Sequence, residues 1–217
     1  MQIKKIIFIA FSIALPLFTL AQKGVEEILK ELSETISSYK CLYFEYTMKA
    51  EDVHLATSEM QDGKVLMKGN KYRLSTTKGV DLYNDGTTQW QYLKDNNEVM
   101  ISLSDSTSDV ITNPLGFIMG DKKEFKQKLK GEVIEDDLNL VEIDFYPKDI
   151  KVPYSYIRVR INEKKRIPFS IKYMGKDGMN YTIKIKNYTP DIEMPKDEEF
   201  VFESSKYPDI EIVDLRE

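Results

Sequence analysis

Few residues in this chain could carry covalent or metal chemistry. One histidine, His54, and one cysteine, Cys41, occur among the 217 residues. His54 lies in a polar stretch that we expect to be a loop, and Cys41 opens an alternating segment, where a lone cysteine is typically a small core residue. A metal centre or a histidine-based relay needs several such groups together, so the sequence predicts no metal site.

The motifs of familiar enzyme sites are also missing. There is no G-x-S-x-G, no glycine-rich phosphate loop, no H-E-x-x-H and no C-x-x-C. Residues 95–97 resemble the start of a calcium loop but lack the glycine that should follow and a suitably placed glutamate. We therefore predict no catalytic residues, no cofactor and no enzymatic activity. A secreted hydrolase, the alternative, would need an inward-facing acid–base pair.

Charge and composition bear on the class of partner. The net charge is −5, and the basic residues are scattered among acidic ones. A nucleic-acid surface would need a clustered basic footprint, so we expect no nucleic-acid partner. Large aromatic and methionine side chains suit an adaptable apolar cavity, although ordinary core packing is their commoner role. The candidates for the lining of such a cavity are Phe44, Tyr46, Met48, Met67, Tyr72, Trp90, Tyr92 and Phe169.

The elements that position these side chains are mostly strands. Between Gly63 and Leu103, short apolar runs are separated by turn residues, which is typical of a meandering antiparallel sheet, and Asp85-Gly86 is the strongest turn. Clean alternation returns from Gly131 onward. About ten strands exceed what a flat sheet carries. We predict a mainly β fold with helices (α+β), in which a curved antiparallel sheet forms an unclosed barrel. Phe200-Val201-Phe202 is the predicted last strand.

Two helices should accompany this sheet. The segment from Val25 to Ile36 has one apolar stripe at helical spacing between acidic residues, and we expect it to cover the open side of the sheet. Pro114 begins a short apolar helix that ends near Met119. Its apolar residues, Leu115, Phe117, Ile118 and Met119, are either plain core or a lid over a ligand cavity. Residues 122–130 should continue as a helical or irregular stretch.

The N-terminal segment reads as a cleaved signal peptide over residues 1–21. Lys4-Lys5 precede an apolar run of about 15 residues, which is shorter than a membrane span, and cleavage is expected near Ala21. Gln22 stands where lipoprotein processing would need a cysteine. We expect a mature, monomeric, exported protein with one domain over residues 22–217.

The order of several short motifs resembles the periplasmic outer-membrane lipoprotein carrier (LolA-like) family. The matching pieces are Gly63-x-Val65-x-Met67, Lys71-Tyr72-Arg73-Leu74, Asp85-Gly86-x-x-x-Trp90-x-Tyr92, Val99-x-Ile101, Asn113-Pro114-Leu115 and Glu199-Phe200-Val201-Phe202. The resemblance implies an apolar cavity under a helical lid in the periplasm. It also implies acylated lipoproteins as cargo, an inner-membrane release machinery as donor and an outer-membrane acceptor. A lipid- or lipoprotein-binding sensory module of the same fold is the alternative.

The resemblance also implies a basic residue that holds the lid closed. In the family this residue is often an arginine followed by proline, just before the aromatic-Arg piece. Here either Lys68 or Gly69 occupies that position, according to the direction of counting, and proline is absent. A lysine makes a point-charge contact rather than a bidentate one. The lid-locking candidates are therefore Lys68 and Arg73.

Overall fold

The computed structural model describes residues 24–104, 114–120 and 122–216, so the predicted signal peptide lies outside the described residues. None of the described helices is long and apolar enough to span a membrane. The helices are α1 (Val25–Ser38), α2 (Pro114–Met119) and the 3-10 turns η1 (Asp197–Phe200) and η2 (Ser204–Lys206). The strands are β1 (Leu42–Asp52), β2 (Thr57–Lys68), β3 (Lys71–Thr76), β4 (Val80–Asn84), β5 (Thr88–Leu93), β6 (Glu98–Leu103), β7 (Phe125–Glu135), β8 (Leu138–Pro147), β9 (Tyr154–Asn162), β10 (Ile167–Gly175), β11 (Met179–Pro190) and β12 (Glu211–Asp214).

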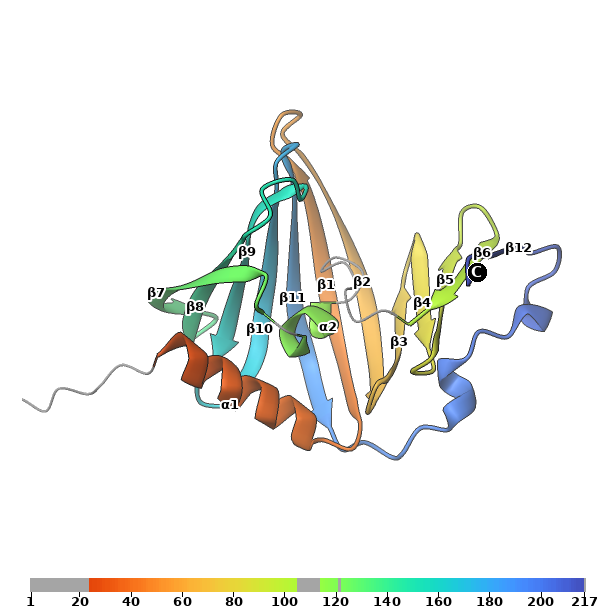
Figure 1. Cartoon of the computed structure of the whole chain (residues 1–217), viewed down its shortest axis with the longest axis horizontal. Helices are drawn as coiled ribbons and strands as arrows, with labels where there is room; N and C mark the ends of the chain where they lie inside the picture. Colours follow the sequence, from red (N-terminus) through yellow and green to blue (C-terminus); the bar gives the residue numbers. More distant parts are fainter. Residues whose placement is uncertain (1–23, 105–113, 121, 217) are drawn as a thin grey trace, which may run out of the picture.

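All twelve strands form one curved sheet with two free ends. Their order is β12-β6-β5-β4-β3-β2-β1-β11-β10-β9-β8-β7, so β7 and β12 are edges that do not pair with each other. Every neighbouring pair is antiparallel except β12 with β6. Figure 1 shows the strands fanning out as a curved sheet with α1 and α2 on its concave side, which we call the hollow. The predicted unclosed antiparallel barrel with helices is confirmed.

Local chemistry fixes the predicted turn at Asp85-Gly86. Three residues link β4 to β5, and the Asp85 carboxylate accepts hydrogen bonds from the backbone N–H groups of Thr87 and Thr88, both at 2.8 Å. Gly86 has a φ of +94°, a conformation that side-chain-bearing residues rarely adopt. The short connection keeps β4 and β5 in register.

Two sequence expectations at the edges of the sheet are wrong. Residues 122–130 contain the start of strand β7, because Lys126, Lys128 and Lys130 alternate with side chains that face the sheet interior. Phe200-Val201-Phe202 is not a strand: η1 ends at Phe200, and the last strand is β12. Strand β7 alternates as other strands do, but its solvent-exposed face carries lysines. Exposed lysines suit an edge strand, because they disfavour pairing with the strands of other chains.

The sheet has an apolar layer on each of its faces. Leu74 and Leu82 are cross-strand partners that face the hollow, whereas their neighbours Arg73 and Tyr83 form the adjacent pair and face outward. We call the buried residues around the hollow the inner cluster: Ile28, Leu32, Ile36, Leu42, Phe44, Tyr46, Val65, Leu74, Leu82, Phe117, Ile118, Val141, Ile143, Phe145, Ile157, Val159, Ile161, Ile171, Tyr173 and Ile183. The outer cluster consists of Tyr83, Tyr92, Val99 and Phe202, with Trp90, Tyr207 and Ile210 packed against them.

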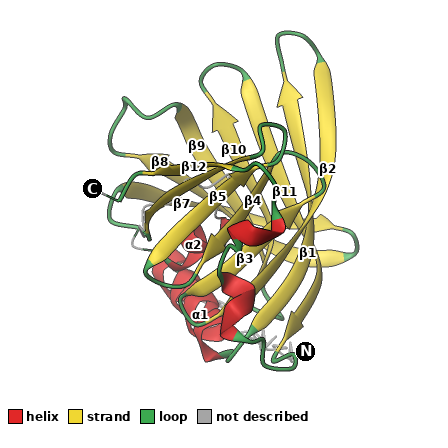
Figure 2. Ribbon diagram, turned by 90° about the vertical axis from the view of Figure 1, so that its right-hand side faces the viewer, coloured by secondary structure: helices red, strands yellow, loops and turns green. Residues whose placement is uncertain are grey.

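The outer cluster exists because the chain passes over the back of the sheet after β11. Residues 191–210, which we call the C-terminal strap, run from the end of β11 past η1 and η2 to β12, as both views show (Figures 1 and 2). The strap contributes Phe202 and Tyr207, whose rings stack 4.7 Å apart. It therefore covers apolar side chains of β4, β5 and β6 that would otherwise meet water.

Candidate functional site

The concave face of the sheet carries the larger of the two buried apolar clusters of the described chain. Phe44 of β1 and Ile143 of β8 are fully buried there, and alternate residues of β9, β10 and β11 continue the layer. Aromatic rings extend it toward β7: Tyr154 lies 5.0 Å from Tyr173, and Phe125 stacks on Tyr154 at 6.4 Å. The strands from β7 to β1 in the sheet order present every second side chain to this face, so an apolar wall follows there.

Helix α1 closes one side of the wall with a single apolar stripe. Ile28, Leu32 and Ile36 recur every four residues and are buried, as predicted from their spacing. The polar side of the helix remains outside, where Glu31 forms an ion pair of 3.2 Å with Arg166 in the turn between β9 and β10. The helix therefore acts as a cover, since it contacts the sheet through one face only.

Helix α2 enters the hollow itself. Phe117 and Ile118 are 8% and 7% exposed, and the Phe117 ring meets Phe145 at 5.3 Å and Phe125 at 5.4 Å, both edge to face. The side chains of Leu115 and Met119 lie outside the described residues. The described apolar residues of α2 thus fill part of the hollow with the protein's own side chains.

Lys122 fastens the end of α2. Its ammonium donates to the carbonyl oxygens of Phe117, Ile118 (3.2 Å) and Gly120 (2.7 Å), and it lies 4.7 Å above the Phe117 ring. A cation at this position satisfies carbonyls that the last helical turn leaves unpaired. The sequence reasoning missed this residue, although a lysine directly after a short helix is the signal that could have found it.

Five of the eight predicted cavity residues come together at the concave face. Phe44 and Tyr46 belong to the inner cluster, and Met48, Met67 and Tyr72 pack against it. The Tyr72 hydroxyl donates to Gln89 at 2.7 Å, which fixes its ring at the polar margin of the face. These five residues share a face because β1, β2 and β3 pair in the register that the alternation predicts.

The predicted inward placement of Trp90 and Tyr92 is wrong. Trp90 pairs with Tyr83 across β4 and β5, and Tyr92 meets Phe202 of the strap at 5.4 Å, so both belong to the outer cluster. Alternation shows which residues of a strand share a face, but not which face points inward. The deciding element is the strap, whose sequence lies more than a hundred residues away.

Phe169 also departs from its predicted position. The pairing of β10 with β9 shifts register between Pro168 and Ser170, so Phe169 sits at an irregularity. Lys184 lies 5.0 Å above its ring, and the neighbours of Lys184 in β11 include Ile183 of the inner cluster. Phe169 is therefore on the outward side, because a bulge reverses the alternation that precedes it.

Neither predicted lid-locking residue contacts α2 among the described residues. The Lys68 ammonium binds Asp197 of η1 at 2.6 Å and the carbonyl of Pro195 at 3.0 Å, and Lys71 binds the other Asp197 oxygen at 2.8 Å. Hydrogen bonds from the two lysines lower the pKa of Asp197 to about 2. Arg73 faces outward over the Tyr83 ring. Lys68 thus fastens the strap rather than the lid. Gly69, the other candidate for the family's basic position, lies in the β2–β3 turn with a φ of +59°.

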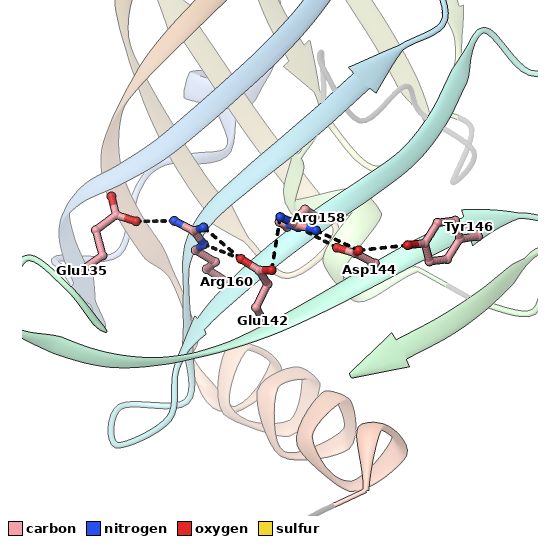
Figure 3. Close-up of polar contacts among 6 residues, drawn as sticks. All are labelled: Glu135, Glu142, Asp144, Tyr146, Arg158 and Arg160. Carbon is pink, nitrogen blue, oxygen red and sulfur yellow. Dashed lines mark hydrogen bonds and ion pairs between the residues drawn. The ribbon is translucent and has the colours of Figure 1, made fainter. Parts of the chain in front are cut away.

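The back of strands β7 to β9 carries a network of ion pairs (Figure 3). Arg158 binds Asp144 through two bonds of 2.7 and 2.9 Å, and Arg160 binds Glu142 at 2.9 Å and Glu135 as well. Burial raises the pKa of Asp144, but the Arg158 hydrogen bonds and charge outweigh it, so the pKa falls below its usual range. Ionised carboxylates tied to arginines stiffen a wall, whereas an acid–base pair needs two groups with separated pKa values.

The described residues offer no group of three metal-ligating side chains. No curated protein matches the sequence.

The similar solved structures are distant in sequence. An uncharacterized conserved protein from Thermus thermophilus is 14% identical, with a TM-score of 0.58 over 88% of this chain and 99% of that one. A LolA superfamily protein from Nitrosomonas europaea is 13% identical, with a TM-score of 0.44 over 83% and 99% of the two chains. LprF from Mycobacterium bovis is 12% identical, with a TM-score of 0.44 over 79% and 96%. At this identity, the similarity to the Thermus protein shows a shared fold only.

The sequence match to a known family is more extensive. Residues 38–203 match the family described as "Outer membrane lipoprotein carrier protein LolA". This range runs from the end of α1 to the strap and so includes the concave face, α2 and the outer cluster. Because it covers well over half of the chain, the chain belongs to the LolA family.

Proposed function

We propose that this protein carries acylated lipoproteins through the periplasm and shelters their acyl chains between the concave face and the two helices. The observation that carries the proposal is the family match together with an apolar wall that two α2 side chains, Phe117 and Ile118, help to fill. Donor and acceptor would be a release machinery at the inner membrane and a receptor at the outer membrane. Export would follow from the predicted signal peptide.

Such a carrier must shield acyl chains from water and must also release them. Each methylene removed from water contributes about 0.8 kcal/mol, so a free acyl chain aggregates or enters the nearest membrane. A cavity that binds too tightly would not release its cargo. A closed empty form that competes with the loaded form lowers the net affinity.

Helix α2 is suited to that competition. It has six residues, too few for a helix that is stable alone, and its end is capped by Lys122 from its own segment. The described contacts of Phe117 with Phe125 and Phe145 are apolar, and acyl chains can replace such contacts without leaving polar groups unpaired. Displacement of Phe117 and Ile118 costs about 3–6 kcal/mol, which about four to eight buried methylenes offset.

The experiment compares one cargo in two forms. The chain without its signal peptide is incubated with an acylated lipoprotein and with the same lipoprotein lacking its acyl chains. Complexes are then detected by size-exclusion chromatography and native mass spectrometry. The carrier should retain the acylated form only and should deliver it to outer-membrane vesicles in preference to inner-membrane ones. Equal failure with both forms would end the proposal, and retention without delivery would favour a sensory or scavenging module.

A further inference from the structure

A pocket lies on the outward side of the sheet, beneath the C-terminal strap. It has a volume of about 250 Å³ and is bounded by Arg73 of β3 and Tyr83 of β4 on the sheet side and by strap residues between Lys196 and Tyr207 on the other. The pocket adjoins a larger one of about 500 Å³ that shares Glu198, Val201 and Glu203 with it. Neither pocket includes the concave face.

Arg73 has no partner for its charge in this pocket. Its Nε is buried without a hydrogen bond, and within the described residues the guanidinium lies within ion-pair distance of no carboxylate. The Tyr83 ring lies 4.9 Å from the guanidinium carbon. The other arginines of the described ranges, at positions 158, 160, 166 and 216, all form ion pairs. A buried donor without an acceptor is costly, and a bound acceptor would remove that cost.

Of the three glutamates that line the pocket, two have a partner among the described residues and one has none. Glu203 binds Lys206 at 2.6 Å, and Glu199 accepts the backbone N–H of Lys196 at 3.2 Å. Glu198 forms no ion pair or side-chain hydrogen bond with any residue of the described chain. The pocket thus presents an unpaired guanidinium and an unpaired carboxylate beside aromatic rings.

We propose that this pocket binds a small zwitterion, whose phosphate or carboxylate is held by Arg73 and whose ammonium faces Glu198. A guanidinium offers two parallel N–H groups to such an anion, and the buried Nε is one of them. A ligand with both charges matches the balanced lining better than a bare anion, which the glutamates would repel. Phosphoethanolamine has this chemistry, either as a free molecule or as the headgroup of a lipid.

The test uses the full mature chain and three probes: O-phosphoethanolamine, inorganic phosphate and ethanolamine. Isothermal titration measures affinity, and the ¹⁵N-bound proton of Arg73 Nε reports occupancy by NMR. Phosphoethanolamine should bind saturably and shift the Nε proton, with affinity at least about tenfold above that of phosphate. Arg73→Lys should weaken it by about tenfold or more, because a lysine cannot form the paired bonds. Absence of any shift, or equal affinity for phosphate, would overturn the proposal.

Two further variants distinguish a local loss of binding from a general loss of folding. Glu198→Gln should abolish the preference for phosphoethanolamine over phosphate while keeping Arg73 in place. Arg216→Gln is the matched control, since Arg216 pairs with Asp214 outside the pocket and its replacement should leave both affinities unchanged.

Vesicles of phosphatidylethanolamine, compared with vesicles of phosphatidylcholine, distinguish the source of the ligand. Arg73-dependent vesicle binding assigns a lipid headgroup, and binding of the free probe alone assigns a small molecule. A preference that survives Glu198→Gln would refute the proposed role of the carboxylate.

Discussion

Replacement of Phe117 by alanine tests whether this residue belongs to a displaceable lid or to the ordinary core. The ring is 8% exposed and packs against Phe125 and Phe145. Its removal weakens the closed form of α2 by about 2–3 kcal/mol through lost apolar burial. If acyl chains must displace α2, a weaker closed form raises the fraction of binding-competent protein. Apparent affinity for an acyl ligand should therefore rise by up to about 30- to 150-fold.

The assay is competition between a fluorescent fatty acid and unlabelled acyl chains of increasing length. In the unaltered protein, affinity should become measurable only beyond about four to eight methylenes, where the chain offsets the displacement of Phe117 and Ile118. The Phe117→Ala variant should bind shorter chains and release them more slowly.

The matched control is Phe202→Ala in the outer cluster. Phe202 is 7% exposed, so both variants lose a ring of the same size and comparable burial. Phe202 contacts Tyr83 and Tyr92 on the far side of the sheet, where it cannot compete with a ligand in the hollow. An equal change of affinity in the two variants, or weaker binding in Phe117→Ala, would refute the reasoning.

Three other predictions follow from single contacts. Lys122→Met should tighten acyl binding by a few fold, measured in the same competition, because it leaves the last carbonyls of α2 without their cation. The two lysines lower the pKa of the Asp197 carboxyl to about 2, so its stabilisation of the strap is complete above its ordinary pKa of 3.8 and is lost as the pH falls from about 4 to 2. The rate of amide hydrogen exchange in η1 should rise in that pH range. Asp197→Asn should remove this pH dependence. Gly63→Val should destabilise the chain in urea titration, because a Cβ at Gly63 would lie 2.3 Å from the Tyr46 ring; an unchanged midpoint would contradict this packing.

The sequence predicted the elements whose two faces differ in polarity. Alternation in β1 placed Phe44, Tyr46 and Met48 on one face, and the structure puts them at the concave side. The stripe of α1 likewise identified its buried residues. In both elements water contacts one face and protein contacts the other, so the spacing of the apolar residues alone identifies the buried side.

The failures occur where a remote segment covers the outer face of a strand or where the register slips. Strand β5 turns Trp90 and Tyr92 toward the strap and Gln91, the partner of Leu82, toward the hollow, and the period of two could not say which of these faces points inward. At Phe169 a bulge in β10 moved the side chain to the other face. Local sequence holds little information on either event, because the strap is remote and the bulge depends on the partner strand.

The distribution of ion pairs and hydrogen bonds indicates which element can move away from the rest of the molecule. The wall of β7 to β9 carries arginines bound to carboxylates, and Asp144 is only 1% exposed, so separating these strands would leave buried charge unpaired. The strap is fastened by Lys68, Lys71 and an aromatic stack. By contrast, Phe117 of α2 meets Phe125 and Phe145 through apolar ring contacts, and the Lys122 ammonium donates to carbonyls of the helix itself. Because apolar contacts can be exchanged for an acyl chain and buried ion pairs cannot, the proposed entry of cargo through α2 requires no rearrangement of the sheet.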